Sequence, residues 1–153
     1  MIEVKFEIQN LESLKEALRK APATTLNEIS KAVQKSALTI ESNAKREAPV
    51  NKQTGGGNLK QNIRTSLITK TRAVVESKAS YSGYVEFGTA PHIINVKNKK
   101  VLANVRTGQF FGKIVHHPGT RPNPYMERAL EKSQNKIGQF FKTAMENVFK
   151  TFK

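Results

Sequence analysis

The stretch Tyr84-Val85-Glu86-Phe87-Gly88-Thr89 lies between two segments whose residues are typical of strands, and the rest of the chain is organised around it. Its aromatic and β-branched residues run directly into Gly-Thr, and glycine accepts the left-handed conformation that ends a helical turn. The stretch therefore predicts a short helical turn capped by Gly88. Glu86 would lie near the negative end of that turn, where a carboxylate is unfavourable. Arg121 and Arg128 are candidates for a cationic partner; a solvated glutamate in a loop is the alternative.

Two long apolar stripes predict two long helices on either side of this stretch. The first helix begins after Pro22, with Thr24 or Thr25 as its cap, and ends at Pro49. Its stripe consists of Leu26, Ile29, Val33, Ala37, Ile40, Ala44 and Ala48. The second helix has Pro124 at its start. Its stripe consists of Met126, Ala129, Leu130, Ser133, Ile137, Phe140, Phe141, Ala144, Met145, Val148, Phe149 and Phe152. We expect this second helix to cover a sheet face, with a neighbouring protein as a second contact, and the first to pack in the core or at a subunit interface.

The first third of the chain and its middle also contain shorter elements. Residues 2–8 alternate apolar and charged side chains, which predicts a strand, and Asn10 can cap a short helix that follows. Leu59–Ile63 predicts one helical turn. Residues 64–78 predict two strands around Thr69–Arg72. Three side chains of these strands are expected to face inward: Leu67, Ala73 and Val75.

The region after Thr89 has the composition of irregular structure with short strands. His92–Val96 predicts a strand, and Val101–Arg106 with Phe110–His116 predicts a hairpin around Thr107-Gly108. The whole pattern favours an α+β fold, an antiparallel sheet packed against long helices, in a single domain over residues 1–153. Gly, Asn and Lys content predicts mobile loops near residues 50–58 and 95–110.

The charge is concentrated in one part of the chain. The net charge is +14, and residues 48–126 hold twelve lysines and arginines against only Glu76 and Glu86, so this segment carries +10. Such asymmetry indicates an acidic partner, either nucleic acid or an acidic protein surface; a solubilising surface is the alternative. The residues expected to face DNA or a partner are Lys52, Lys60, Arg64, Lys97, Lys99, Lys100, Arg106 and Lys113.

Several kinds of chemistry lack their residues in this sequence. There is no cysteine and no aspartate, so thiolate metal sites, disulfides and a Ser-His-Asp triad are excluded. His116 and His117 would point to opposite faces of a strand, and His92 could join either one only through the tertiary fold. We expect no catalytic, metal or cofactor-binding residues and no cofactor. No apolar run approaches membrane-spanning length, and the N-terminus lacks a signal-peptide core, which predicts a cytosolic location and no membrane partner.

Three blocks of sequence resemble a family of tailed-phage neck proteins. The first is Tyr81–Thr89; the second is His117-Pro118-Gly119-Thr120; the third is Pro124–Leu130. Upstream, Ala44–Val50 and Thr54-Gly55 with Asn58-Leu59 are similar to the family's helix ending in Ala-Pro and its Thr-Gly-x-Leu pattern. The extra glycine in Gly55-Gly56-Gly57 and Tyr125 in place of the commoner Phe depart from that pattern. The family-motif positions with an expected structural role are Tyr84, Glu86, Phe87, Gly88, Thr89, Pro118, Gly119, Pro124 and Arg128.

This resemblance implies a structural role in phage or prophage assembly. The members of the family are small head–tail joining or tail-completion components, so we expect part of a ring through which DNA passes. Expected partners are further copies of the chain, other head or tail proteins and, non-specifically, DNA. The protein would be found in the host cytoplasm during assembly and then in the virion. The alternative function is a basic nucleic-acid-binding module or a small metal-independent ribonuclease, because acid–base catalysis needs only positioned groups.

Overall fold

The computed structural model describes residues 2–4, 23–50, 56–96, 101–104 and 108–150. The chain divides into two compact units. The first unit consists of Met1–Ser82 and Pro124–Lys153, and the second consists of Gly83–Asn123. Helices and antiparallel sheets together give the α+β class expected from the sequence. That the chain forms one domain stays a prediction.

Two long helices dominate the first unit, as the apolar stripes predicted. Helix α2 spans Ala23–Glu47 and α5 spans Tyr125–Lys150. Six of the seven stripe residues expected on α2 are buried, and Leu26 is half-buried. Helix α2 ends just before Pro49, which has no N–H to continue the hydrogen-bond ladder. The Pro124 carbonyl accepts the Arg128 N–H at 3.1 Å in the first turn of α5.

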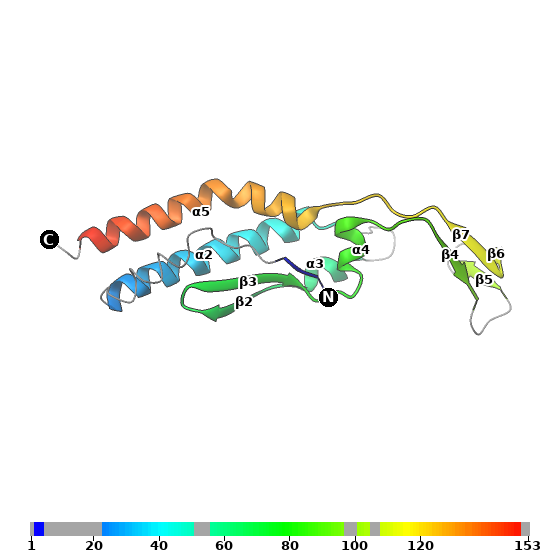
Figure 1. Ribbon diagram of the computed structural model, residues 1–153, viewed down its shortest axis with the longest axis horizontal. Coiled ribbons are helices and arrows are strands. Elements are labelled where there is room, and N and C mark those ends of the chain that lie inside the picture. Colours follow the sequence, from blue (N-terminus) through cyan, green and yellow to red (C-terminus); the bar gives the residue numbers. More distant parts are fainter. Residues whose placement is uncertain (1, 5–22, 51–55, 97–100, 105–107, 151–153) are drawn as a thin grey trace. The chain divides into compact units, whose positions relative to one another are not determined.

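Helix α2 is the middle layer of the first unit. It packs along α5 on one side and on strands β2 (Ile63–Thr69) and β3 (Arg72–Ser77) on the other (Figure 1). The expectation that the last helix covers a sheet face is wrong among the described residues. Helix α2 covers the β2–β3 hairpin, and α5 packs on α2. A small residue helps α5 to lie on α2: Ala129 is fully buried one turn before Ser133, which bonds Asn43 of α2, and small side chains let two helix axes approach closely.

The sheet of the first unit is antiparallel, with the order β1-β3-β2, where β1 spans Ile2–Val4. Ala73 and Val75 are buried, as predicted. The prediction for Leu67 is wrong, since it is 51% exposed. It lies beside the turn, where the register of the hairpin shifts between Leu67 and Thr69. Helix α3 (Asn58–Gln61) precedes β2 and supplies the expected helical turn.

The aromatic end of α5 is less buried than its stripe suggested. Phe140 and Phe141 are half-buried, whereas Met145 is 38% and Phe149 is 64% exposed. The buried side of α5 is narrower and consists of Tyr125, Met126, Ala129, Ser133, Ala144 and Val148. An apolar strip of α5 therefore faces away from α2.

The second unit is built from short strands. Helix α4 spans Ser82–Phe87 and ends before Gly88, whose φ of 73° is left-handed as predicted. Strand β4 (His92–Asn95) pairs with β7 (Ile114–His117), and β5 (Leu102–Asn104) pairs with β6 (Gln109–Gly112). The predicted strand and hairpin are thus present. The second arm of the hairpin is divided into β6 and β7 after Gly112, where φ is 89°.

Some sequence predictions fall outside the described residues. These are the helix after Asn10, the second half of the strand at 2–8, Phe152, and residues 51–55, 97–100 and 105–107 of the two loops expected to be mobile. Within the described part of the chain, no helix is both long enough and apolar enough to cross a membrane.

The packing of α2 on α5 leads to a first prediction. Ala129 is fully buried, so Ala129→Leu should force the two helices apart and lower the free energy of unfolding by roughly 1–3 kcal/mol. Denaturant midpoints measure the change. Gln134→Leu adds the same side chain at an exposed position of the same helix and should change stability by less than about 0.5 kcal/mol. Equal effects from the two substitutions would contradict the packing described.

Candidate functional site

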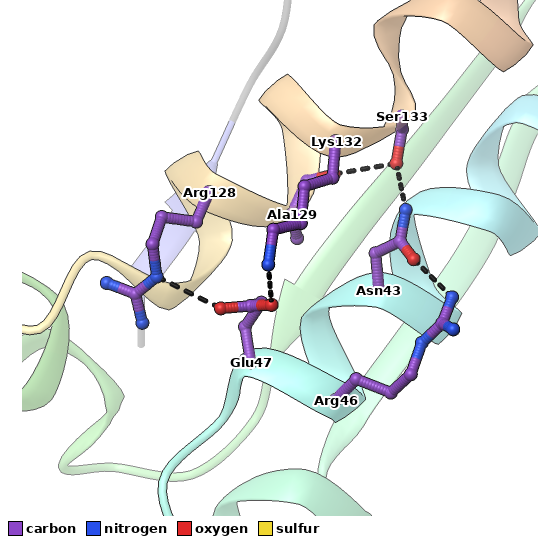
Figure 2. A network of polar contacts seen from close by, with 7 residues as sticks. All are labelled: Asn43, Arg46, Glu47, Arg128, Ala129, Lys132 and Ser133. Carbon is purple, nitrogen blue, oxygen red and sulfur yellow. Dashed lines mark hydrogen bonds and ion pairs between the residues drawn. The ribbon is translucent and has the colours of Figure 1, made fainter.

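A carboxylate at the end of α2 ties this helix to the start of α5 (Figure 2). Glu47 accepts a hydrogen bond from Arg128 Nε at 3.1 Å and one from Lys132 Nζ at 2.5 Å. The two donors lie one turn apart on α5. Donation from Lys132, then from Arg128, lowers the pKa of Glu47 below its ordinary value. The pair of cations compensates for a carboxylate at the negative end of a helix.

A buried polar pair lies one turn before Glu47. Asn43 Nδ2 donates to Ser133 Oγ at 2.7 Å, and Ser133 Oγ donates to the Ala129 carbonyl at 2.6 Å. Arg46 donates to the Asn43 side-chain carbonyl. Ser133 is fully buried and Asn43 is 8% exposed, so breaking this pair would leave polar groups without water. The pair fixes which residues of α2 and α5 lie opposite one another.

A third tie lies near the start of α2. Glu28 accepts hydrogen bonds from Asn147 Nδ2 at 2.9 Å and from Lys31 Nζ at 2.6 Å. Donation from Lys31, then from Asn147, lowers the pKa of Glu28. The start of α2 thus lies beside the end of α5, and the end of α2 beside the start of α5. The two helices form an antiparallel pair that is tied along its length.

In the second unit, Gly88 and Gly119 allow the chain at Thr89 to lie against the chain at Thr120; we call this contact the glycine crossing. Thr89 and Thr120 exchange backbone hydrogen bonds at 3.0 and 3.1 Å, and their hydroxyl oxygens lie 2.8 Å apart. A Cβ on Gly88 would lie 2.4 Å from the Thr120 carbonyl oxygen, and one on Gly119 would lie 2.3 Å from the Thr89 oxygen. Both glycines also have left-handed φ angles of 73° and 86°. Only glycine satisfies the space and the backbone conformation at both positions.

Two histidines of this unit that are far apart in the sequence lie side by side in the structure. His92 and His117 are direct partners in the β4–β7 ladder, and their rings stack with centroids 4.9 Å apart. His92 Nδ1 lies 3.0 Å from the Ala90 carbonyl, and His117 Nδ1 accepts the Gly119 N–H at 3.1 Å. His116 lies on the opposite face of the β4–β7 pair. Within the described ranges, no group of three or more His or Glu side chains could hold a metal ion.

The cations expected to face a partner are only partly described. Lys60 and Arg64 are exposed on α3 and β2 of the first unit, and Lys113 is exposed between β6 and β7 of the second. Lys52, Lys97, Lys99, Lys100 and Arg106 lie outside the described residues. A common surface for all eight therefore stays a prediction.

The family-motif positions differ in their surroundings. Tyr84 and Phe87 are 65% and 68% exposed on α4, whereas Glu86 between them is 4% exposed. Pro118 is exposed, and Gly119 lies at the crossing described above. Arg128 donates to Glu47, and the cationic partner predicted for Glu86 stays a prediction.

Sequence reasoning misses the ties between the helices. The apolar stripe includes Ser133 as one of its members and gives no role to Asn43 or Glu47. A signal is present, because Asn43 lies between stripe positions Ile40 and Ala44 and so near the buried face. The partner on another helix cannot be read from spacing along one helix.

The glycine crossing gives a second prediction. Gly88→Ala should disrupt the Thr89–Thr120 bridge, because the added methyl meets a backbone oxygen that cannot move independently. Gly108→Ala is a matched control with a φ of 68° and nothing within 4 Å of the added carbon. The control carries only the left-handed strain of about 1–2 kcal/mol. Amide exchange at Thr89 and Thr120 should therefore accelerate strongly in the first variant and little in the second; equal acceleration would refute the clash.

The ties of Glu47 give a third prediction, on pH. The folded-state pKa of Glu47 lies below its ordinary value of 4.5, so its ion pairs stabilise the fold above that pH and are lost as pH falls through the folded pKa. Glu47→Gln should therefore lower the melting temperature at pH 7, and the difference from the wild type should shrink below about pH 4.5. Glu146→Gln, at an exposed position of α5, is the control and should show little difference at either pH.

Comparison with known proteins gives one family. No curated protein and no solved structure matches the chain. The family model described as "Bacteriophage HK97-gp10, putative tail-component" matches residues 9–88. The match covers just over half of the chain and includes α2, α3, the β2–β3 hairpin and α4, ending at Gly88. The chain therefore belongs to the HK97-gp10-like family, which is described as a bacteriophage tail component.

Proposed function

We propose that the protein is a structural assembly protein of the head–tail junction or of tail completion, and that it forms part of a homo-oligomeric ring through which DNA passes. The carrying observation is the charge of the middle segment: residues 48–126 hold +10 of the net +14. One of its two acids, Glu86, is buried, and the other, Glu76, lies 3.9 Å from Lys78. Exposed cations of this segment would face DNA or an acidic neighbour. The protein, encoded by a phage or prophage, would assemble in the host cytoplasm and then become part of the virion.

The antiparallel helix pair supports this role. A ring subunit must keep its shape while neighbours bind to it, and the three ties between α2 and α5 make that pair a rigid element. A channel for moving DNA should not read its sequence. Binding through phosphate neutralisation meets that need, because it carries no base information and falls steeply with salt.

Titration of two unrelated labelled duplexes at several salt concentrations tests the DNA contact. A variant with Lys60, Arg64 and Lys113 replaced by Gln should reduce the slope of log affinity against log salt by roughly 0.9 for each phosphate that these side chains neutralise in the wild type. Replacing Lys35, Lys136 and Lys150 by Gln removes the same charge outside the basic segment and should leave the slope unchanged. Salt-insensitive binding, or strong preference for one duplex, would reject a passive channel.

Two further measurements separate the ring from its alternatives. Sedimentation of the purified protein, alone and with co-expressed tail components, should show closed oligomers; a monomer under all of these conditions would reject the ring. Incubation with RNA and DNA, with and without divalent metal, should leave both intact. Cleavage without metal would instead favour the small ribonuclease.

A further inference from the structure

The second unit has no apolar core of its own among its described residues. Glu86 is the one described residue of this unit that is buried, and every described apolar side chain of the unit is half-buried or exposed. A two-stranded ribbon is marginally stable at best in water unless a further layer covers it. We call β4–β7 together with β5–β6 the ribbon. Its stability is expected to depend on a surface that this unit does not supply.

One face of the ribbon presents apolar side chains. Ile93 and Ile114 are 57% and 58% exposed, and their places in the β4–β7 register put them on the same face, diagonal to one another. His116 is exposed on that face beside Ile93. In the other sheet, beyond the break at Gly112, Phe110 of β6 is 73% exposed. Residues 83–123 contain six lysines and arginines and one acid, the buried Glu86, so this face meets no exposed carboxylate of its own unit.

The side of α5 that faces away from α2 has complementary features. Glu131, Gly138, Met145 and Phe149 recur at steps of seven, seven and four residues, which places them along one side of the helix; we call them the α5 strip. All four are exposed. A glycine inside a helix costs about 1 kcal/mol relative to alanine, yet a Cβ on Gly138 would have nothing within 4 Å. Packing against the described side chains gives no reason for this glycine.

We propose that the ribbon of one copy docks on the α5 strip of a second copy, an inference that rests on the proposed ring. The occupant is a second copy because one chain carries both complementary surfaces. A contact between two different surfaces of identical subunits passes from copy to copy, which is the kind of contact that closes rings.

The spacing along the two surfaces gives the contact a direction. Phe110 and Ile114 are four residues apart across Gly112 and so at most about 13 Å apart along the chain, and Met145 and Gly138 are separated by about 10 Å of helix. Phe110 then lies on Met145 and Phe149, Ile114 enters the space over Gly138, and His116 lies toward Glu131. Lys142 is exposed on the same side of α5, and its flexible chain can turn its ammonium group to solvent.

Cysteine cross-linking in the full chain tests this register, because the protein has no native cysteine. Four single variants are made, Phe110→Cys, His116→Cys, Met145→Cys and Glu131→Cys, and mixed in pairs with a short bismaleimide linker. The expected pairs are Phe110→Cys with Met145→Cys and His116→Cys with Glu131→Cys. The crossed pairs use the same four residues but lie about 20 Å apart on the helix. Expected pairs should cross-link at least about fivefold more; equal yields, a crossed preference or ribbon-to-ribbon products would overturn the proposal.

A second variant keeps the test independent of folding. Gly138→Leu fills the space over the strip while favouring the helix itself, so the subunit should melt no lower than the wild type. Its self-association should weaken at least about tenfold by sedimentation. Thr143→Leu, exposed on another side of α5, should associate as the wild type does.

The outcomes separate this inference from the ring itself. A wild type that forms rings while Gly138→Leu associates equally well would overturn the docking and leave the ring standing. A wild type that stays monomeric at every concentration and with co-expressed tail components would overturn both.

Discussion

Close packing of α2 against α5 is the constraint on which the rest of the first unit depends. Ala129 of α5 is fully buried one turn before Ser133, which bonds Asn43 of α2, so a larger side chain at Ala129 would separate the helices. With the axes this close, Asn43 reaches Ser133 and Glu47 reaches two cations of α5. The polar ties are therefore a consequence of small apolar residues, and they in turn fix the position of one helix along the other.

In this arrangement the two sides of each helix have different neighbours. One side of α2 carries the β2–β3 hairpin, where the Thr65 hydroxyl donates to the Ala37 carbonyl at 3.4 Å, and the other carries α5. Helix α5 then has a side with no layer of its own unit upon it among the described residues. Near its C-terminal end this side exposes Met145 and Phe149, and exposed apolar side chains that lie together are typical of a surface that binds a neighbour, which agrees with a structural component of a phage tail.

The second unit is held together by different interactions from those of the first. Backbone contact, and not side-chain burial, holds its described residues together: Gly88 and Gly119 bring the chain close enough for Thr89 and Thr120 to pair. Its strands are short, its described apolar side chains are half-buried or exposed, and its charge is positive. The stability of such a unit is expected to depend on a partner that supplies the burial the ribbon lacks.

The sequence by itself determined both long helices, the β2–β3 hairpin, the strands after Thr89 and the left-handed cap at Gly88, since each depends on local periodicity or on one residue's backbone preference. The order and spacing of short motifs resembled a phage family, and charge placement indicated an acidic partner. Only the tertiary structure decided that α5 packs on α2 and not on the sheet, that Leu67 is exposed, and that His92 stacks on His117. These depend on which surfaces meet across long stretches of chain, and periodicity shows that a face is apolar without showing what covers it.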